Sequence, residues 1–170
     1  RGIQGCNVKF AVKIDIKTKS EINVMREACK LCAEVRDLCA QAVAPGVTTG
    51  EINDIAIEFC KKNSVKASFY KYSGFPGHLC VSINEEVIHG IPSHNRVILP
   101  GDLVKTDIGI FKNGFHSDTS RTVPLCVNDM EVLRLVETTK KCLRAGIDAI
   151  GPGVRLGDVG NAIEKVAIEA

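Results

Sequence analysis

The feature that most constrains the fold of this chain is an Asn113-Gly114 pair between two segments of alternating apolar and polar residues. Asn-Gly favours a two-residue type I′ turn, in which both central residues need positive φ. Segments 102–111 and 115–123 are therefore predicted to form an antiparallel β-hairpin. This register places Asp107 diagonal to Asp118, on the same face of the sheet, at a backbone separation of roughly 7–8 Å. The hairpin thus predicts an acidic face.

The other face of the hairpin is predicted to be the core side. It carries Val104, Thr106, Ile108 and Ile110 on the first segment, with Phe115 and Val123 on the second. Two carboxylates on the acidic face repel each other unless one is protonated or a cation lies between them. An oxygen-rich pair above a buried anchor suits a divalent metal. Paired aspartates are more often ordinary surface residues, here with Arg121 or Lys105 as partners, so the neighbouring motifs have to decide.

Three short motifs precede the hairpin. The glycines and proline of the first mark a loop, and residues 79–83 read as a short buried strand. His89 lies between an apolar run and a turn, where its ring could point into a cleft, although a lone histidine is more often structural. The motifs are Tyr72-Ser73-Gly74-Phe75-Pro76-Gly77, Ser82-Ile83-Asn84-Glu85 and His89-Gly90-Ile91-Pro92.

Together, these motifs and the aspartate pair resemble the type I methionine aminopeptidases. That family carries Gly-Phe-Pro, Ser-x-Asn-Glu and His-Gly-Ile-Pro in this order, followed by aspartates at the positions of Asp107 and Asp118. The resemblance runs from about Lys17 to Ala170 and implies the pita-bread fold, an α/β (α+β) architecture in which helices back a curved antiparallel sheet. The implied reaction is hydrolytic removal of the initiator methionine from the amino termini of nascent peptides.

The resemblance also implies roles for individual residues. Asp107 would bind one divalent metal ion and Asp118 would bridge two, with cobalt, manganese, iron and zinc all open as the metal. His89 would be the catalytic residue that contacts the substrate beside the metals. The pocket for the methionine side chain would be lined by Phe69, Tyr72, Phe75 and Cys80.

Some residues depart from that pattern. The string from Asp118 to Thr122 also resembles the related X-Pro dipeptidases, which share the fold and metal chemistry but lack His-Gly-Ile-Pro. Ser73 and Thr106 stand where the family has other residues, which leaves the fine substrate preference open. An X-Pro peptidase fragment and a non-catalytic pita-bread module that binds proteins therefore stay as alternatives.

An internal repeat is the second informative feature. Residues 45–52, Pro-Gly-Val-Thr-Thr-Gly-Glu-Ile, recur at 152–159 as Pro-Gly-Val-Arg-Leu-Gly-Asp-Val. Each copy follows a helix-like stretch, 22–43 or 131–150, and opens another helix. Thr48 and Glu51 form a predicted capping box, with Asp158 as the matching acid. The alternative is that Pro-Gly-x-x-x-Gly is merely a common helix connector. Acids and apolar residues that match beyond the glycines favour duplication.

The repeat predicts that the chain is incomplete, because the counterpart of the metal-bearing hairpin would lie beyond residue 170. The family likewise supplies one histidine and two glutamates from its second half, and none can be assigned here. We therefore expect residues 1–16 to be an amino-terminal extension, with a strand through Val8, Phe10 and Val12, and residues 17–170 to be an incomplete catalytic domain. The truncated chain is expected to be inactive alone and to self-associate through its uncovered surfaces.

Helix signals and strand counts complete the expected architecture. Thr18 and Glu21 form a further capping box that opens the first helix, and a second helix spans about 51–63. Three or four strands follow between residues 66 and 124, and two more helices fill 129–170. The first helix has an apolar stripe that includes three cysteines, all expected to be buried, namely Cys29, Cys32 and Cys39.

Composition limits the partners. The net charge is +2 and the basic residues are scattered, which argues against a nucleic-acid footprint. A local basic run fits a solvated strand face better than a partner site, although a ribosome contact would suit the implied activity; it comprises Lys9, Lys13, Lys17 and Lys19. No apolar run is long enough to cross a membrane, and no signal peptide is visible. Eight cysteines without such a signal indicate a reducing, cytoplasmic location.

Overall fold

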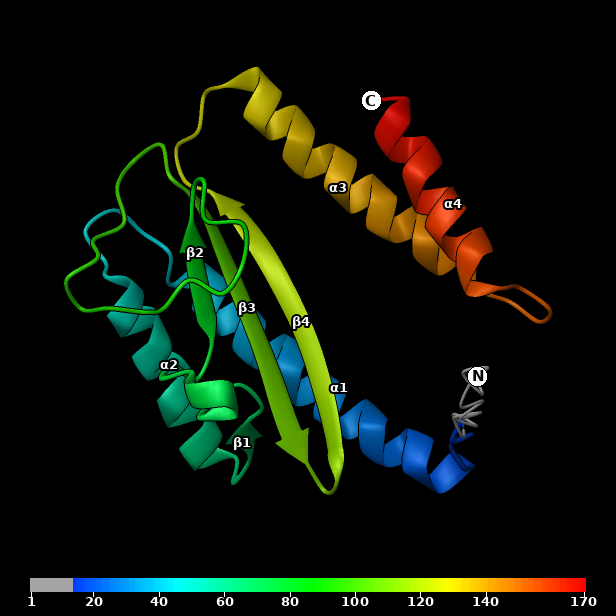
Figure 1. The fold of residues 1–170 in the computed structure, drawn as a ribbon. Coiled ribbons are helices and arrows are strands. Elements are labelled where there is room, and N and C mark those ends of the chain that lie inside the picture. The colour runs from blue at the N-terminus through cyan, green and yellow to red at the C-terminus, as the bar shows by residue number, and fades with distance from the viewer. Residues whose placement is uncertain (1–13) are drawn as a thin grey trace, which may run out of the picture.

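The computed structural model describes residues 14–170 of the chain. Within this part, helices cover one side of a four-stranded antiparallel sheet, and a second helix pair follows the sheet in the chain (Figure 1). The elements are α1 (Lys19–Gln41), α2 (Thr49–Lys62), β1 (Lys66–Ala67), the short 3-10 helix η1 (Tyr72–Gly74), β2 (Cys80–Ile83), β3 (Leu103–Lys112), β4 (Phe115–Pro124), α3 (Met130–Asp148) and α4 (Leu156–Ile168).

Strand β3 organises the sheet. It pairs with β4 along one edge, whereas β1 and β2 follow one another along its other edge. The turn between β3 and β4 has φ of 49° at Asn113 and 89° at Gly114, which are the positive values that a type I′ turn requires. Lys112 consequently pairs with Phe115, and the predicted hairpin and its register are confirmed.

Helix α1 lies across the core face of the hairpin. Val104, Ile108 and Ile110 are fully buried beneath it, so the predicted core side of β3 is confirmed. Two buried polar contacts join the layers: the Cys32 thiol donates to the carbonyl of Ile108 at 3.1 Å, and the Ser117 hydroxyl donates to the carbonyl of Ala28 at 3.1 Å. These two hydrogen bonds fix the position of α1 relative to β3 and β4.

The first two helices begin where the sequence predicts. In each, the threonine hydroxyl accepts from the third backbone N–H of the helix, and the glutamate accepts from the threonine N–H. Those distances are 3.3 and 2.7 Å at Thr18 and Glu21, and 3.2 and 2.7 Å at Thr48 and Glu51. Such reciprocal capping satisfies donors that a helix start otherwise leaves unpaired.

The predicted burial of Cys29 is wrong. The buried line on α1 runs through Ala28, Cys32, Val35 and Cys39, and Cys29 is exposed because it lies about 100° around the helix from Ala28. Ile22, near the start of α1, is also exposed. The small residue Ala28, rather than its apolar-looking neighbour, meets the hairpin.

Helices α3 and α4 pack on each other. Gly146 of α3 permits the close approach, since a Cβ there would lie 2.9 Å from Cδ1 of Ile163. Figure 1 shows this pair beside the sheet rather than in the layer formed by α1 and α2. Their exposed apolar side chains include Met130, Leu135, Leu143, Ile147, Leu156 and Ile168.

The strand predicted through Val8, Phe10 and Val12 lies outside the described residues, as does most of the predicted extension 1–16. Within residues 14–170, no helix combines the length and apolarity that crossing a bilayer requires.

Candidate metal and substrate site

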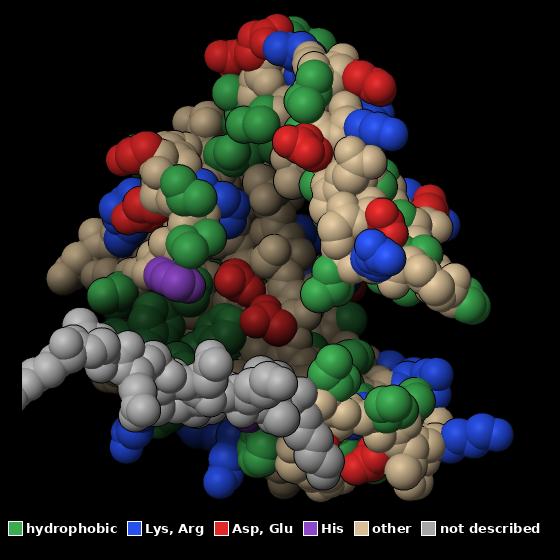
Figure 2. All heavy atoms as spheres, turned by 45° about the vertical axis from the view of Figure 1, so that its right-hand side comes forward, with side chains coloured by type: hydrophobic (Ala, Val, Ile, Leu, Met, Phe, Trp, Pro, Cys, Tyr) green, Lys and Arg blue, Asp and Glu red, His purple; other side chains and the backbone are tan. Residues whose placement is uncertain are grey.

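The two hairpin aspartates converge on the face of the sheet opposite α1. Asp118 pairs with Gly109 and Asp107 pairs with Ser120, so the acids are diagonal neighbours on one face, as predicted. Burial, followed by the charge and hydrogen bond of Asp118, raises the pKa of Asp107 to about 6. Figure 2 shows acidic side chains set back in a hollow of this surface.

Neither basic residue considered as an ordinary partner balances this pair. Arg121 lies on the core face and forms an ion pair with Asp37 at 3.0 Å. Lys105 shares the acidic face but donates to the carbonyl of Asn84 at 2.6 Å. The side chains of Arg121 and Lys105 therefore bind partners other than Asp107 and Asp118.

A divalent cation fits this donor set in part. Two carboxylates that repel each other are stabilised by a cation between them, and carboxylate oxygen is a preferred ligand of hard divalent ions. Within the described residues, however, no group of three or more His, Cys, Asp and Glu side chains could hold a metal ion. By themselves, Asp107 and Asp118 would give a cation an incomplete coordination sphere.

Cys80 lies beside the acid pair. It pairs with Asp107 across β2 and β3, and its side chain is almost fully buried. Burial, with smaller effects of the charges of Asp107 and Asp118, raises the pKa of its thiol to about 11. The predicted pocket residue therefore borders the acidic face as a neutral thiol at neutral pH.

His89 reaches the same face from the loop after β2. Its backbone has φ of 60°, an uncommon conformation for a residue with a Cβ. The next residue, Gly90, donates to Ser82 on that face, and the charge of His89 lowers the pKa of Asp107.

The three aromatic residues predicted to line the pocket come from one loop. Phe69 packs close to the hairpin, because a Cβ at Gly109 would lie 3.0 Å from its Cε1. The loop is closed by hydrogen bonds from Tyr72 N to the Phe69 carbonyl and from Phe75 N to the Tyr72 carbonyl, both 2.9 Å. The structure thus brings Phe69 next to the partner of Asp118, whereas the Tyr72 side chain is 73% exposed.

Sequence reasoning assigned no supporting role to Gly109, Ser82 or Thr49. Gly109 provides the space for Phe69, while the two hydroxyls hold the loop that carries His89. The position of Gly109, two residues after Asp107 in an alternating strand, places it on the acidic face and was the available signal. No local pattern indicates the contact of Thr49, since its partner Ser93 is distant in the chain.

Residues 23–170 match the model of the metallopeptidase family M24. The chain is 40% identical over 152 residues to a methionine aminopeptidase of Clostridium acetobutylicum, covering 89% of this chain and 61% of that protein. It is 45% identical over 155 residues to a methionine aminopeptidase of Treponema pallidum, covering 91% and 60%. The chain therefore spans about three fifths of the length of these curated relatives.

Solved structures share the fold. A methionine aminopeptidase from Thermotoga maritima superposes with a TM-score of 0.89 at 36% identity, covering 92% of this chain and 63% of that chain. A prolidase from Pyrococcus furiosus superposes with a TM-score of 0.80 at 21% identity, covering 91% and 44%, and this likeness concerns the fold alone. The expected pita-bread architecture is confirmed in the part that the chain spans.

Proposed function

Because the chain belongs to the metallopeptidase family M24, we propose that it forms the amino-terminal part of a methionine aminopeptidase. The full-length protein would remove the initiator methionine from nascent polypeptides. The observation that carries this proposal is the convergence of Asp107, Asp118 and His89 on one face of the sheet. Members of the family use divalent metal ions.

The residues present divide the work of such a reaction. Two divalent cations, held in part by Asp107 and Asp118, would polarise the scissile carbonyl and lower the pKa of a bound water. His89 would contact the peptide beside the acids. Phe69, Tyr72, Phe75 and Cys80 would form the apolar pocket for the methionine side chain. Cobalt, manganese, iron and zinc are all compatible with these ligands.

The first test separates the chain from the full-length protein. Two carboxylates are few for ions that take about six ligands each. The 170-residue chain should therefore bind manganese or cobalt weakly and release no methionine from a Met-Ala-Ser peptide. The full-length protein should release methionine, and Asp118→Asn should abolish the release. Turnover by the short chain that Asp118→Asn removes would contradict the first expectation.

A second assay addresses substrate class. The full-length protein should cleave Met-Ala peptides and leave Ala-Pro peptides intact, because the His89-Gly90-Ile91-Pro92 string and the 40% identity support the methionine-specific group. Cleavage of Ala-Pro alone would identify an X-Pro peptidase. Cleavage of neither peptide with any of the four metals would favour a non-catalytic module.

The partners follow from the same function. Nascent peptide amino termini would be the substrates, met in the cytoplasm, and the basic run from Lys9 to Lys19 would contact the ribosome. Full-length protein should then co-sediment with ribosomes at low salt, and replacing Lys9, Lys13, Lys17 and Lys19 by glutamate should abolish it. Unchanged co-sedimentation of that variant would exclude the contact.

The isolated 170-residue chain should also self-associate. Helices α3 and α4 expose Leu143, Ile147 and Leu156 to solvent, and such apolar surface favours association in water. Sedimentation velocity should give a dimer or larger species that Leu143→Glu dissociates. A monomeric mass for the unmodified chain would exclude self-association.

A further inference from the structure

The loop that carries His89 is fastened to β2 at the next residue. The Gly90 N–H donates to the buried Ser82 hydroxyl at 3.0 Å, and the Gly90 carbonyl accepts from Val81 N at 3.0 Å. A Cβ at Gly90 would collide with the Val81 carbonyl, so the glycine allows this close approach. Ser82 lies two residues after Cys80 and hence on the acidic face of the sheet.

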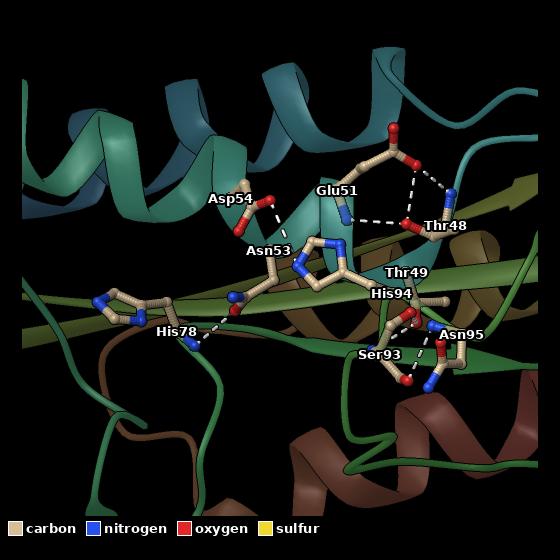
Figure 3. Close-up of polar contacts among 9 residues, drawn as sticks. All are labelled: Thr48, Thr49, Glu51, Asn53, Asp54, His78, Ser93, His94 and Asn95. Carbon is tan, nitrogen blue, oxygen red and sulfur yellow. Dashed lines mark hydrogen bonds and ion pairs between the residues drawn. The ribbon is translucent and has the colours of Figure 1, made fainter.

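The same loop is fastened again three residues later, at the start of α2. The buried Thr49 hydroxyl accepts from Ser93 N at 2.9 Å and donates to the Ser93 carbonyl at 3.1 Å (Figure 3). Gly50 N donates to the same carbonyl at 3.0 Å. Pro92 lies between the two attachment points, and its ring restricts φ. The segment 90–93 is therefore short, stiff and held at both ends.

The neighbouring threonine has a different task. The Thr48 hydroxyl and N–H bond to Glu51 and complete the capping box of α2, as Figure 3 shows, while Thr49 points to the loop. Thr48 thus caps the helix, and the adjacent Thr49 binds the loop. Thr48 is a matched control for Thr49.

We propose that the hydroxyls of Ser82 and Thr49 are positioning groups that hold His89 beside Asp107 and Asp118. His89 needs such support because its positive φ persists only when surrounding structure enforces it. Ser82 acts on the residue next to His89, whereas Thr49 acts four residues away. Loss of the Ser82 hydroxyl should therefore displace His89 more than loss of the Thr49 hydroxyl.

Proton NMR and amide hydrogen exchange of the 170-residue chain test this placement without any assay of activity. Ser82→Ala should raise the exchange rate of the Gly90 amide about tenfold and shift the His89 ring-proton resonance. Thr49→Val, which keeps the shape of the side chain, should do the same to the Ser93 amide with a smaller shift at His89. Thr49→Ser keeps the hydroxyl and should restore both.

Thr48→Val removes a hydroxyl one residue away and should leave the His89 resonance unchanged while it weakens the start of α2. The proposal is overturned if Ser82→Ala and Thr49→Val leave the His89 resonance in place. It is equally overturned if Thr48→Val shifts that resonance as much as Thr49→Val does.

The kinetic consequence rests on the proposed function and is measured in the full-length protein. Ser82→Ala should lower kcat on a Met-Ala-Ser peptide about tenfold with little change in KM, and Thr49→Val should lower kcat less. In a His89→Ala background neither substitution should lower kcat further, because residues that act through one group are not additive. An undiminished loss in that background would overturn the positioning role. A wild-type protein without turnover would overturn the proposed function, while the NMR result would still decide the placement of His89.

Discussion

The helix pairs α1–α2 and α3–α4 share a starting pattern and differ in what covers them. Gly46 and Gly153 both have positive φ, 89° and 82°, at the same place in the repeat. The acid three residues after each N-cap accepts from the cap N–H, at 2.7 Å in α2 and 2.9 Å in α4. Yet Thr49 of α2 is buried, whereas Leu156, its counterpart in α4, is 92% exposed.

This difference separates two sources of structure. The turn glycine and the capping acid are local, so both copies of the repeat start their helices alike. Burial is not local, because α1 and α2 have a hairpin to cover and α3 and α4 have mainly each other. A repeated pattern therefore predicts where helices begin, and the sheet decides which of their faces become core.

The largest expected change in the free energy of unfolding comes from replacing one buried isoleucine of α2. Ile52→Ala removes a fully buried side chain from the cluster that joins α1, α2 and the sheet. It should lower the free energy of unfolding by about 3 kcal/mol, since lost burial and a residual cavity add. Urea denaturation of the 170-residue chain, followed by circular dichroism, measures the change.

The matched control is Ile147→Ala in α3, where the side chain is half exposed. Its cost should stay within about 0.5 kcal/mol. An equal cost for the two substitutions would show that α3 is covered in solution and would remove the contrast between the helix pairs.

Much of the part formed by α1, α2 and the sheet could be predicted from the sequence, because short local motifs determine its turn and its helix starts. The Asn113-Gly114 turn determined the strand register, and the register alone placed Asp107 beside Asp118. The capping boxes located the starts of α1 and α2. The burial of Cys29 was predicted wrongly. Whether Ala28 or Cys29 faces the core depends on where α1 contacts the strands, which the helical pattern alone does not determine.

The supports of the site were less predictable than its acids. Thr49 and Ser93 lie far apart in the sequence, and either hydroxyl-bearing residue is unremarkable in its own segment. The same holds for Gly109, whose missing Cβ matters because Ser68 and Phe69, which directly follow β1, lie against it. Long-range contacts of this kind follow from tertiary packing, which a single sequence does not display.

A smaller effect is expected at the N-caps of α2 and α4, where a threonine in one copy of the repeat is an arginine in the other. Thr48 caps α2 with its hydroxyl, whereas Arg155 at the equivalent place has no acceptor in its side chain. Thr48→Ala should cost about 1 kcal/mol in global unfolding. Arg155→Thr should instead slow amide hydrogen exchange in the first turn of α4 and leave global unfolding unchanged. Global stabilisation by Arg155→Thr would show that α4 unfolds together with α1 and α2.

The smallest change in the free energy of unfolding should come from the pair Asp107 and Asp118, which lies on the sheet that α1 and α2 cover. The pKa of Asp107 is raised to about 6 from an ordinary value of 3.8, so the folded state binds this proton more tightly than the unfolded state. Its contribution to stability is therefore fully present below pH 3.8 and is lost as the pH rises through 6. Asp118→Asn removes the like charge and should raise the free energy of unfolding at pH 8 by up to about 1 kcal/mol, a value reduced by solvent screening.

The gain from Asp118→Asn should vanish below pH 4, where Asp107 is protonated in both proteins. Asp37→Asn is the control, because Asp37 pairs with Arg121 at 3.0 Å and its loss should be neutral or slightly destabilising. Urea titrations at pH 3.5 and pH 8 compare the three proteins. A gain of equal size at both pH values would mean that repulsion between the carboxylates is not its cause. A gain confined to pH 8 would show that repulsion between the carboxylates of Asp107 and Asp118 lowers the stability of the folded chain. A divalent cation between the two carboxylates would relieve that repulsion.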